Sequence, residues 1–136
     1  MKKGKRIKPE VALEYRLLLT HRYNERRKKT VMVAALRTTN EFSNFRYQIV
    51  VEEHRTNNEL RLKIQGLRAP QVSLPGSGPA TFEKEYDDFA GQLTLIVTKL
   101  GGEENIFEVD ISSKNITILK SPKQKFIELV TGAEQW

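Results

Sequence analysis

Two histidines, His21 and His54, are the first side chains of this sequence to consider as general bases or metal ligands. His21 lies in a basic segment beside Arg22, whose charge opposes both protonation of the imidazole and binding of a cation. His54 follows two glutamates but belongs to no spaced ligand set, such as two histidines four residues apart on a helix. Because a metal site needs three or four converging ligands, we predict neither a metal site nor a catalytic histidine.

The densest group of carboxylates falls between Phe82 and Phe89. The aromatic residues of this segment fit a helix as well as an edge strand. If it is a strand, three of its acids share one face, where they can do acid–base work or bind a divalent cation. The segment lacks the Asp/Asn and glycine pattern of a calcium loop, so we predict a solvated face. A remote alternative is an enzyme with a carboxylate site near 83–88, built from Glu83, Glu85 or Asp87.

The chain contains no cysteine, which excludes thiolate zinc sites, iron–sulfur clusters and cysteine nucleophiles. The segment Gly76-Ser77-Gly78-Pro79 lacks the Lys-Ser/Thr ending of a phosphate-binding loop, and its proline removes a backbone donor. Its serine is not in a Gly-x-Ser-x-Gly nucleophile elbow. We predict no catalytic residue and no cofactor, and we favour a protein that is not an enzyme.

Positive charge is concentrated near the N-terminus. The formal net charge is +6; residues 1–40 contain 12 Lys and Arg and three acids, whereas the other 96 residues contain 11 Lys and Arg and 14 acids. Such asymmetry indicates an anionic partner, most often nucleic acid. The simpler interpretation, which we favour from charge alone, is that these cations only solvate a small domain or pair with its acids. The candidate polyanion-binding residues are Lys2, Lys3, Lys5, Arg6, Lys8, Arg22, Arg26, Arg27, Lys28 and Lys29.

These cations are predicted to lie on a flexible basic arm, residues 1–8, and on a basic amphipathic helix, residues 9–29. Pro9 suits the first helical position, where its missing N–H is not needed. Leu13 and Leu17 fall on the side of the helix opposite its main apolar stripe, so we predict that they mediate self-association, with a dimer favoured. The alternative is that a loop of the same domain covers them. The stripe itself consists of Val11, Tyr15, Leu18, Leu19 and Tyr23.

The body, residues 30–120, is predicted to consist mainly of short strands. Residues 30–37 are apolar and fit either a buried strand or a continuation of the helix. Apolar and polar residues then alternate on both sides of two turns, which predicts one hairpin around residues 55–58 and another around Gly101-Gly102. Asn115 marks a further tight turn into a strand that starts at Ile116.

A short helix is predicted at residues 122–131, with Ser121 as its N-cap and Gly132 as its stop. The predicted fold is therefore mainly β (α+β by content): an antiparallel β-sandwich or distorted barrel of six or seven strands, in a single domain over residues 9–136. No apolar run is long enough for a signal-peptide core or a membrane span, so we predict a cytoplasmic protein without a membrane partner.

These features predict a non-enzymatic binding or interaction module that self-associates as a homo-oligomer through its N-terminal helix. The alternative is a nucleic-acid-binding accessory protein that uses the basic arm and the helix. Salt dependence of binding to a polyanion separates the two, because phosphate contacts made by basic side chains release counterions.

Overall fold

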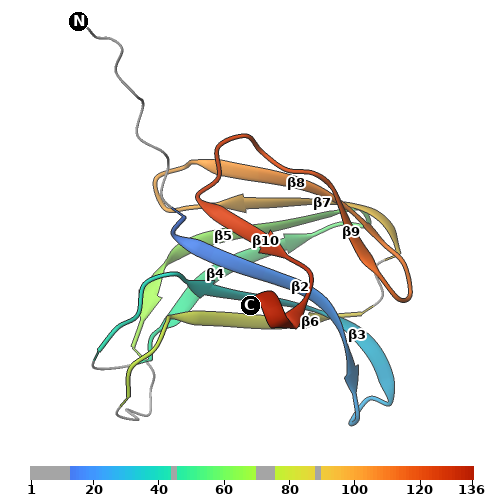
Figure 1. Cartoon of the computed structure of the whole chain (residues 1–136), viewed down its shortest axis with the longest axis horizontal. Helices are drawn as coiled ribbons and strands as arrows, with labels where there is room; N and C mark the ends of the chain where they lie inside the picture. The colour runs from blue at the N-terminus through green and yellow to red at the C-terminus, as the bar shows by residue number, and fades with distance from the viewer. Residues whose placement is uncertain (1–12, 44–45, 70–75, 88–89) are drawn as a thin grey trace, which may run out of the picture.

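The computed structural model describes residues 13–43, 46–69, 76–87 and 90–136 (Figure 1). The described strands form one nine-stranded sheet in the order β10-β2-β3-β6-β4-β5-β7-β8-β9. The strands are β2 (Tyr15–Asn24), β3 (Lys29–Thr38), β4 (Gln48–Arg55), β5 (Glu59–Arg68), β6 (Thr81–Tyr86), β7 (Gly91–Thr98), β8 (Glu104–Ile111), β9 (Ile116–Lys120) and β10 (Ile127–Val130).

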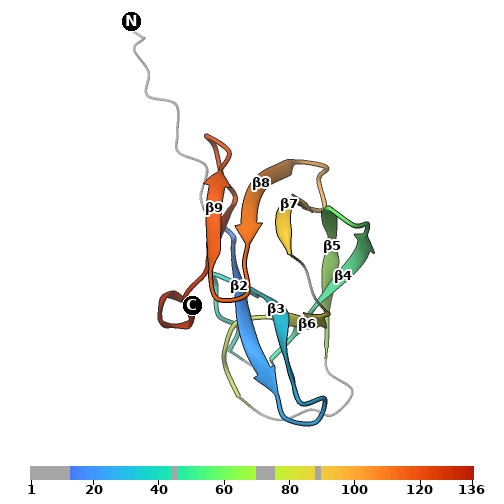
Figure 2. The same ribbon diagram turned by 90° about the vertical axis from the view of Figure 1, so that its right-hand side faces the viewer.

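The sheet curls on itself into a half-barrel (Figure 2). One half contains β10, β2, β3 and β6, and the other contains β4, β5, β7, β8 and β9. The two halves are joined within the sheet at a single parallel pair, Gln48 with Thr81. Such a narrow joint lets the sheet bend sharply there, so that the inner faces of the two halves meet.

The core lies between these two inner faces. Alternate residues of a strand point to opposite faces of the sheet, so every second apolar residue enters this core. Leu17 and Leu19 of β2 are completely buried, as are Leu60 and Leu62 of β5. Phe107 of β8 is also buried, and belongs to the same cluster. Both halves therefore depend on each other for burial of their apolar faces.

A second, smaller apolar cluster lies on the outer face of β2, β3 and β10, and Trp136 packs against it. The guanidinium of Arg37 lies 5.2 Å from the centre of the Trp136 ring and donates a hydrogen bond to the backbone oxygen of the same residue. Under this cluster, β2, β3 and β10 are therefore buried on both faces. The cluster consists of Leu18, Val31, Val33, Ala35 and Val130.

The predicted helix at 9–29 is wrong over residues 13–29, which form β2, a turn and the start of β3. Because β2 is buried on both faces around its middle, Leu18 adds an outward apolar residue to the inward Leu17 and Leu19, and the resulting spacing imitates a helix. The basic run before β3 forms the hairpin turn, in which Lys28 has φ 55°. Residues 9–12, like the predicted arm, lie outside the described residues.

The predicted helix at 122–131 is wrong for the same reason. Residues 127–130 form β10, which pairs in parallel with β2 and has apolar residues on both faces. Only a single 3-10 turn, Ala133–Gln135, follows it. Over so few residues a spacing of three or four does not distinguish a helix from a doubly buried strand.

The mainly-β class is confirmed, whereas the sandwich of six or seven antiparallel strands is replaced by one curled sheet of nine described strands. That sheet is mixed, since β10 pairs in parallel with β2, and β5 with β7. Residues 30–37 lie in β3, and β6 occupies 81–86. Both segments whose sequence fits either a helix or a strand are therefore strands. Both predicted hairpins are confirmed as β4–β5 and β7–β8, and so is the turn from Ser112 to Asn115.

The two halves also meet along a line that we call the seam, where β2 and β10 approach β8 and β9. Asn105 of β8 is the buried polar residue that holds the seam. Its side-chain oxygen accepts hydrogen bonds from the backbone N–H groups of Phe126, at 2.9 Å, and Ile127, at 3.3 Å. Its amide nitrogen donates to the carbonyl of Gln124, at 3.1 Å. One side chain thus satisfies three backbone groups of the segment that leads into β10.

We expect Asn105→Ala to lower the free energy of unfolding by about 2–3 kcal/mol, because it leaves buried backbone groups without partners. Chemical denaturation monitored by Trp136 fluorescence measures this loss. Asn57→Ala, in the exposed β4–β5 turn, is the control and should change stability little. Equal stability of the two variants would show that Asn105 does not hold the seam.

The β7–β8 turn yields a second prediction. Gly102 has φ +96°, a region that side chains other than glycine rarely adopt, and its N–H donates to the carbonyl of Lys99. Gly101 has no positive φ, and a Cβ at either position meets open space. Gly102→Val should therefore cost about 1–2 kcal/mol of stability, and Gly101→Val clearly less. Thermal unfolding of the two variants checks this difference, and equal costs would contradict it.

Candidate nucleic-acid interface

Three carboxylates of the segment between Phe82 and Phe89 share the outer face of the sheet, as predicted for a strand. Glu83 and Glu85 accept hydrogen bonds from Arg22 of β2, at 2.7 and 3.1 Å. Asp87 forms ion pairs with Arg27 and Lys29. The register of β2, β3 and β6 brings these residues together across about 60 positions of the sequence. Asp88 lies outside the described residues.

This cluster lacks the electrostatics of an acid–base site. The hydrogen bond from Arg22, with a second from Asn24, holds the pKa of Glu85 below its ordinary value. Hydrogen bonds from Lys29 and Arg27 likewise lower the pKa of Asp87. A general acid needs the opposite shift, which burial away from cations produces. The three carboxylates instead neutralise cations of the β2–β3 hairpin.

Another polar group lies on the inner side of β6. The phenol of Tyr86 donates a hydrogen bond of 2.8 Å to Glu53, which also forms an ion pair of 3.3 Å with Lys84. Burial, and then the hydrogen bond to Glu53, raises the pKa of Tyr86 well above its usual range. The phenol therefore stays protonated and acts as a donor that anchors Glu53, not as a base or nucleophile.

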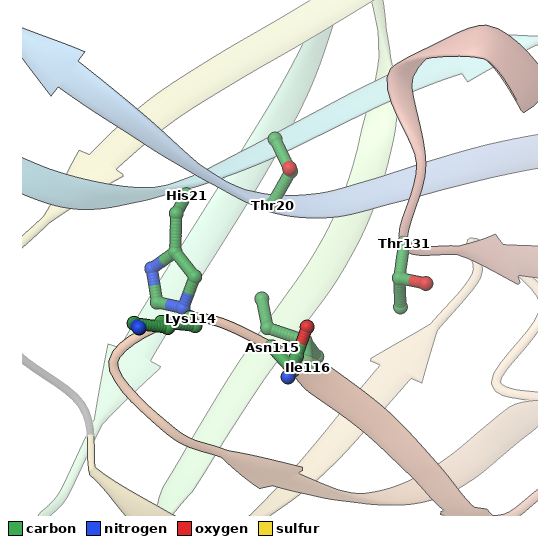
Figure 3. Close-up of a pocket in the computed structure, with 6 residues that line it drawn as sticks. All are labelled: Thr20, His21, Lys114, Asn115, Ile116 and Thr131. Carbon is green, nitrogen blue, oxygen red and sulfur yellow. The ribbon is translucent and has the colours of Figure 1, made fainter.

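His21 lies at the seam. Its ring nitrogen Nε2 donates a hydrogen bond of 2.8 Å to the carbonyl of Ser112, which links β2 to the turn before β9. In Figure 3 the imidazole and Lys114 line one side of a hollow, and Thr131 lies on its other side. This hollow has a volume of about 230 Å³ and no carboxylate in its lining, which consists of Thr20, His21, Lys114, Asn115, Ile116 and Thr131.

Four lysines follow the seam from the turn before β9 to the segment before β10. We call them the lysine strip: Lys114, Lys120, Lys123 and Lys125. The sequence from Ser112 to Ile127 contains no acid. Among the residues that the structure describes, none of the four forms an ion pair with a carboxylate. Of the four, Lys120 lies opposite Glu108 of β8 in the register, and no ion pair joins these two residues.

The strip continues toward the β2–β3 turn. His21 connects the two, because it contacts the turn before β9 and lies three residues before Asn24, where β2 ends. In both views the path descends from the loop before β10, along β9, to the β2–β3 hairpin (Figures 1 and 2). Arg26 and Lys28 of the turn are exposed and form no ion pair within the described part of the chain.

The structure thus divides the predicted polyanion-binding residues. Arg26 and Lys28 are available, whereas Arg22, Arg27 and Lys29 are neutralised by acids of β6 and the residue after it. The remaining predicted residues, Lys2, Lys3, Lys5, Arg6 and Lys8, lie outside the described residues.

Leu13 and Leu17 do not form a shared surface. Leu17 is completely buried in the core, whereas Leu13 is 39% exposed at the edge of the described chain. The helix face that motivated an interface at these two leucines does not exist. A homo-oligomer stays a prediction without an assigned surface.

His54 and the glycine-rich segment each form part of the β-pairing. His54 is exposed on the β4–β5 hairpin opposite Arg61. Gly78 forms an isolated bridge with Phe42. Within the described ranges, no group of three or more His, Asp or Glu is arranged to hold a metal ion. The same ranges contain no helix with the length and hydropathy needed to cross a membrane.

Sequence reasoning missed the lysine strip, although a local signal was present. Counting charge over the first 40 residues and the rest assigns the body a net negative charge and conceals the acid-free stretch from Ser112 to Ile127. A count over shorter windows identifies that stretch. Its proximity to His21 could not be read from local sequence, since 91 positions separate His21 and Ser112.

The Arg22 ion pairs predict a pH-dependent contribution to stability. A folded-state pKa below the unfolded value gives a contribution that is present above the unfolded pKa and is lost as the pH falls through the folded pKa. Wild type should therefore exceed Arg22→Gln in stability at pH 7, and the difference should shrink below about pH 4, near the ordinary pKa of Glu85. Urea denaturation at pH 7 and pH 3 measures it.

Arg68→Gln is the matched control, because Arg68 donates to the neutral side chain of Gln48. Its effect on stability should be the same at both pH values. If Arg22→Gln also shows no pH dependence, the pKa of Glu85 is not lowered by Arg22 in the folded protein.

Comparisons with protein-family models, with curated proteins and with solved structures find no match for this chain. No function can therefore be carried over from a relative. What the protein binds has to be inferred from its own exposed and unneutralised side chains.

Proposed function

We propose that this protein is a non-enzymatic binding module for a polyanion, with nucleic acid as the ligand class. The observation that carries this proposal is the lysine strip: four cations in a stretch of sequence without an acid, none neutralised by the described carboxylates. Phosphate groups along a nucleic-acid backbone bind such cations without needing a preformed pocket.

The contrast with four paired cations elsewhere in the described chain supports this choice. Arg22, Arg27 and Lys29 have acidic partners on the outer face, and Lys99 pairs with Glu14 and Glu103. The four lysines of the strip form no ion pair with a described carboxylate, and unpaired cations raise the local potential toward an anion.

The arm extends the same argument. Glu14 donates its backbone N–H to the carbonyl of Phe126, at 2.7 Å, so the described chain begins beside the end of the lysine strip. Residues 1–8, with five more cations, are joined to this point through the sequence. Five cations so close in sequence to a basic surface can add phosphate contacts to the same ligand.

The two other hypotheses have less support. An enzyme with a carboxylate site near 83–88 would need an enclosed pocket and raised carboxylate pKa values, whereas the pKa values of Glu85 and Asp87 are lowered. Self-association through Leu13 and Leu17 would need Leu17 at the surface, and it is buried. Mass measurement by light scattering alongside the binding experiment tests oligomerisation separately.

The test is a titration of labelled oligonucleotides with the protein at two or more salt concentrations. Binding should weaken steeply as salt rises, since each phosphate contact contributes about 0.7–0.9 to the slope of log affinity against log salt. Lys120→Glu should weaken binding. It should also lower the steepness of that slope by about 1, the amount expected for the loss of one phosphate contact.

Lys63→Glu is a matched control, since Lys63 and Lys120 are both exposed strand residues that lie opposite a glutamate in the neighbouring strand. Both variants change the net charge equally. Equal weakening by the two would indicate that only net charge matters, and absence of binding to wild type at low salt would overturn the proposed function.

A further inference from the structure

Tyr23 is an exposed aromatic residue at the end of β2. Its side chain is 59% exposed, although it points to the same face of the strand as Leu17 and Leu19, which are fully buried. The core ends before it, because β2 and β3 extend beyond β6 as a two-stranded hairpin, and only the small Thr30 lies opposite. Its ring is therefore presented to solvent and not to the core.

The surroundings of Tyr23 are basic. Arg26 and Lys28 of the adjoining turn have no carboxylate partner among the described residues, and Glu25 is the only acid of that turn. The acidic cluster contacts Arg22 and Asn24, which point to the opposite face of β2. Tyr23 thus lies on the face of the hairpin that the neutralising acids do not share.

The same face leads to the lysine strip. His21 precedes Tyr23 by two residues, points to the same side of the strand and bonds to Ser112. Lys114 lines the same hollow as the imidazole (Figure 3). Lys114, His21 and Tyr23 thus follow one another from the turn before β9 toward the end of the β2–β3 hairpin.

We propose that Tyr23 stacks on an unpaired base, so that the ligand is single-stranded nucleic acid; this rests on the proposed function. Bases of a duplex are stacked on one another and present only their edges, whereas those of a single strand expose their faces to an aromatic ring. Stacking is tolerant of sequence because every base has such a face, while the cations hold the backbone.

The experiment compares Tyr23→Ala and Tyr23→Phe with wild type on three probes of equal length: a single-stranded oligothymidine, an abasic oligomer with the same phosphodiester backbone, and a duplex. Tyr23→Ala should weaken binding to oligothymidine about fivefold or more, and Tyr23→Phe about twofold at most. The salt dependence should stay unchanged, because no phosphate contact is lost. Binding of the abasic oligomer and the duplex should not respond.

Leu100→Ala is the matched control, as Leu100 is a large apolar residue exposed at another hairpin turn, and it should leave all three affinities unchanged. Unchanged binding of oligothymidine by Tyr23→Ala would overturn stacking while the salt-dependent function stands. Equal losses on the abasic and base-containing strands would also overturn it, because they indicate a structural effect. Failure of wild type to bind any probe would overturn both proposals.

Discussion

The fold depends on closure of one sheet around its own core. Its two halves share a single pair within the ladder, Gln48 with Thr81, so the ladder alone cannot hold them face to face. Burial of the apolar inner faces supplies the attraction, and Asn105 fixes the opposite side by bonding to the chain before β10. The arrangement of the seam follows from this closure, because it brings β2 beside the turn before β9.

Closure of the sheet also determines which cations have an acidic partner. The three hairpin cations that face outward form ion pairs with acids of β6 and the residue after it, whereas the lysines at the seam form no ion pair with a described carboxylate. A mixed surface thus lies on the outside of one half and a basic one along the seam. Such separation can orient an approaching polyanion, since the potential differs between faces even though the net charge is modest.

The segments that were predicted correctly and those that were not differ in burial. The β4–β5 and β7–β8 hairpins have a face with polar residues, so their alternation has the period of a strand. In β2 and β10 both faces are buried, because Trp136 covers the outer one, and the apolar spacing then fits a helix equally well. For β2 this covering residue is more than 100 positions away, and for β10 the pairing partner β2 is equally distant, so neither can be read from local pattern.

The candidate site was predictable only in part. Cations at 22–29 were identified from sequence, but the acids that neutralise three of them lie about 60 positions further on. The lysine strip was readable as an acid-free stretch, yet its meaning depends on the seam. Which cations are available to a ligand is a property of the tertiary register, not of the charge count.

The end of the sheet at β9 has a consequence for the behaviour of the protein in solution. β9 is five residues long, has an irregular register at Glu108/Val109 and carries the partly exposed Ile118 and Leu119. Shortness, a bulge and lysines are the features by which natural sheets keep a free edge from recruiting a strand of another chain. The lysine strip therefore also discourages aggregation, and an anion that neutralises it removes the repulsion between the edges of neighbouring molecules.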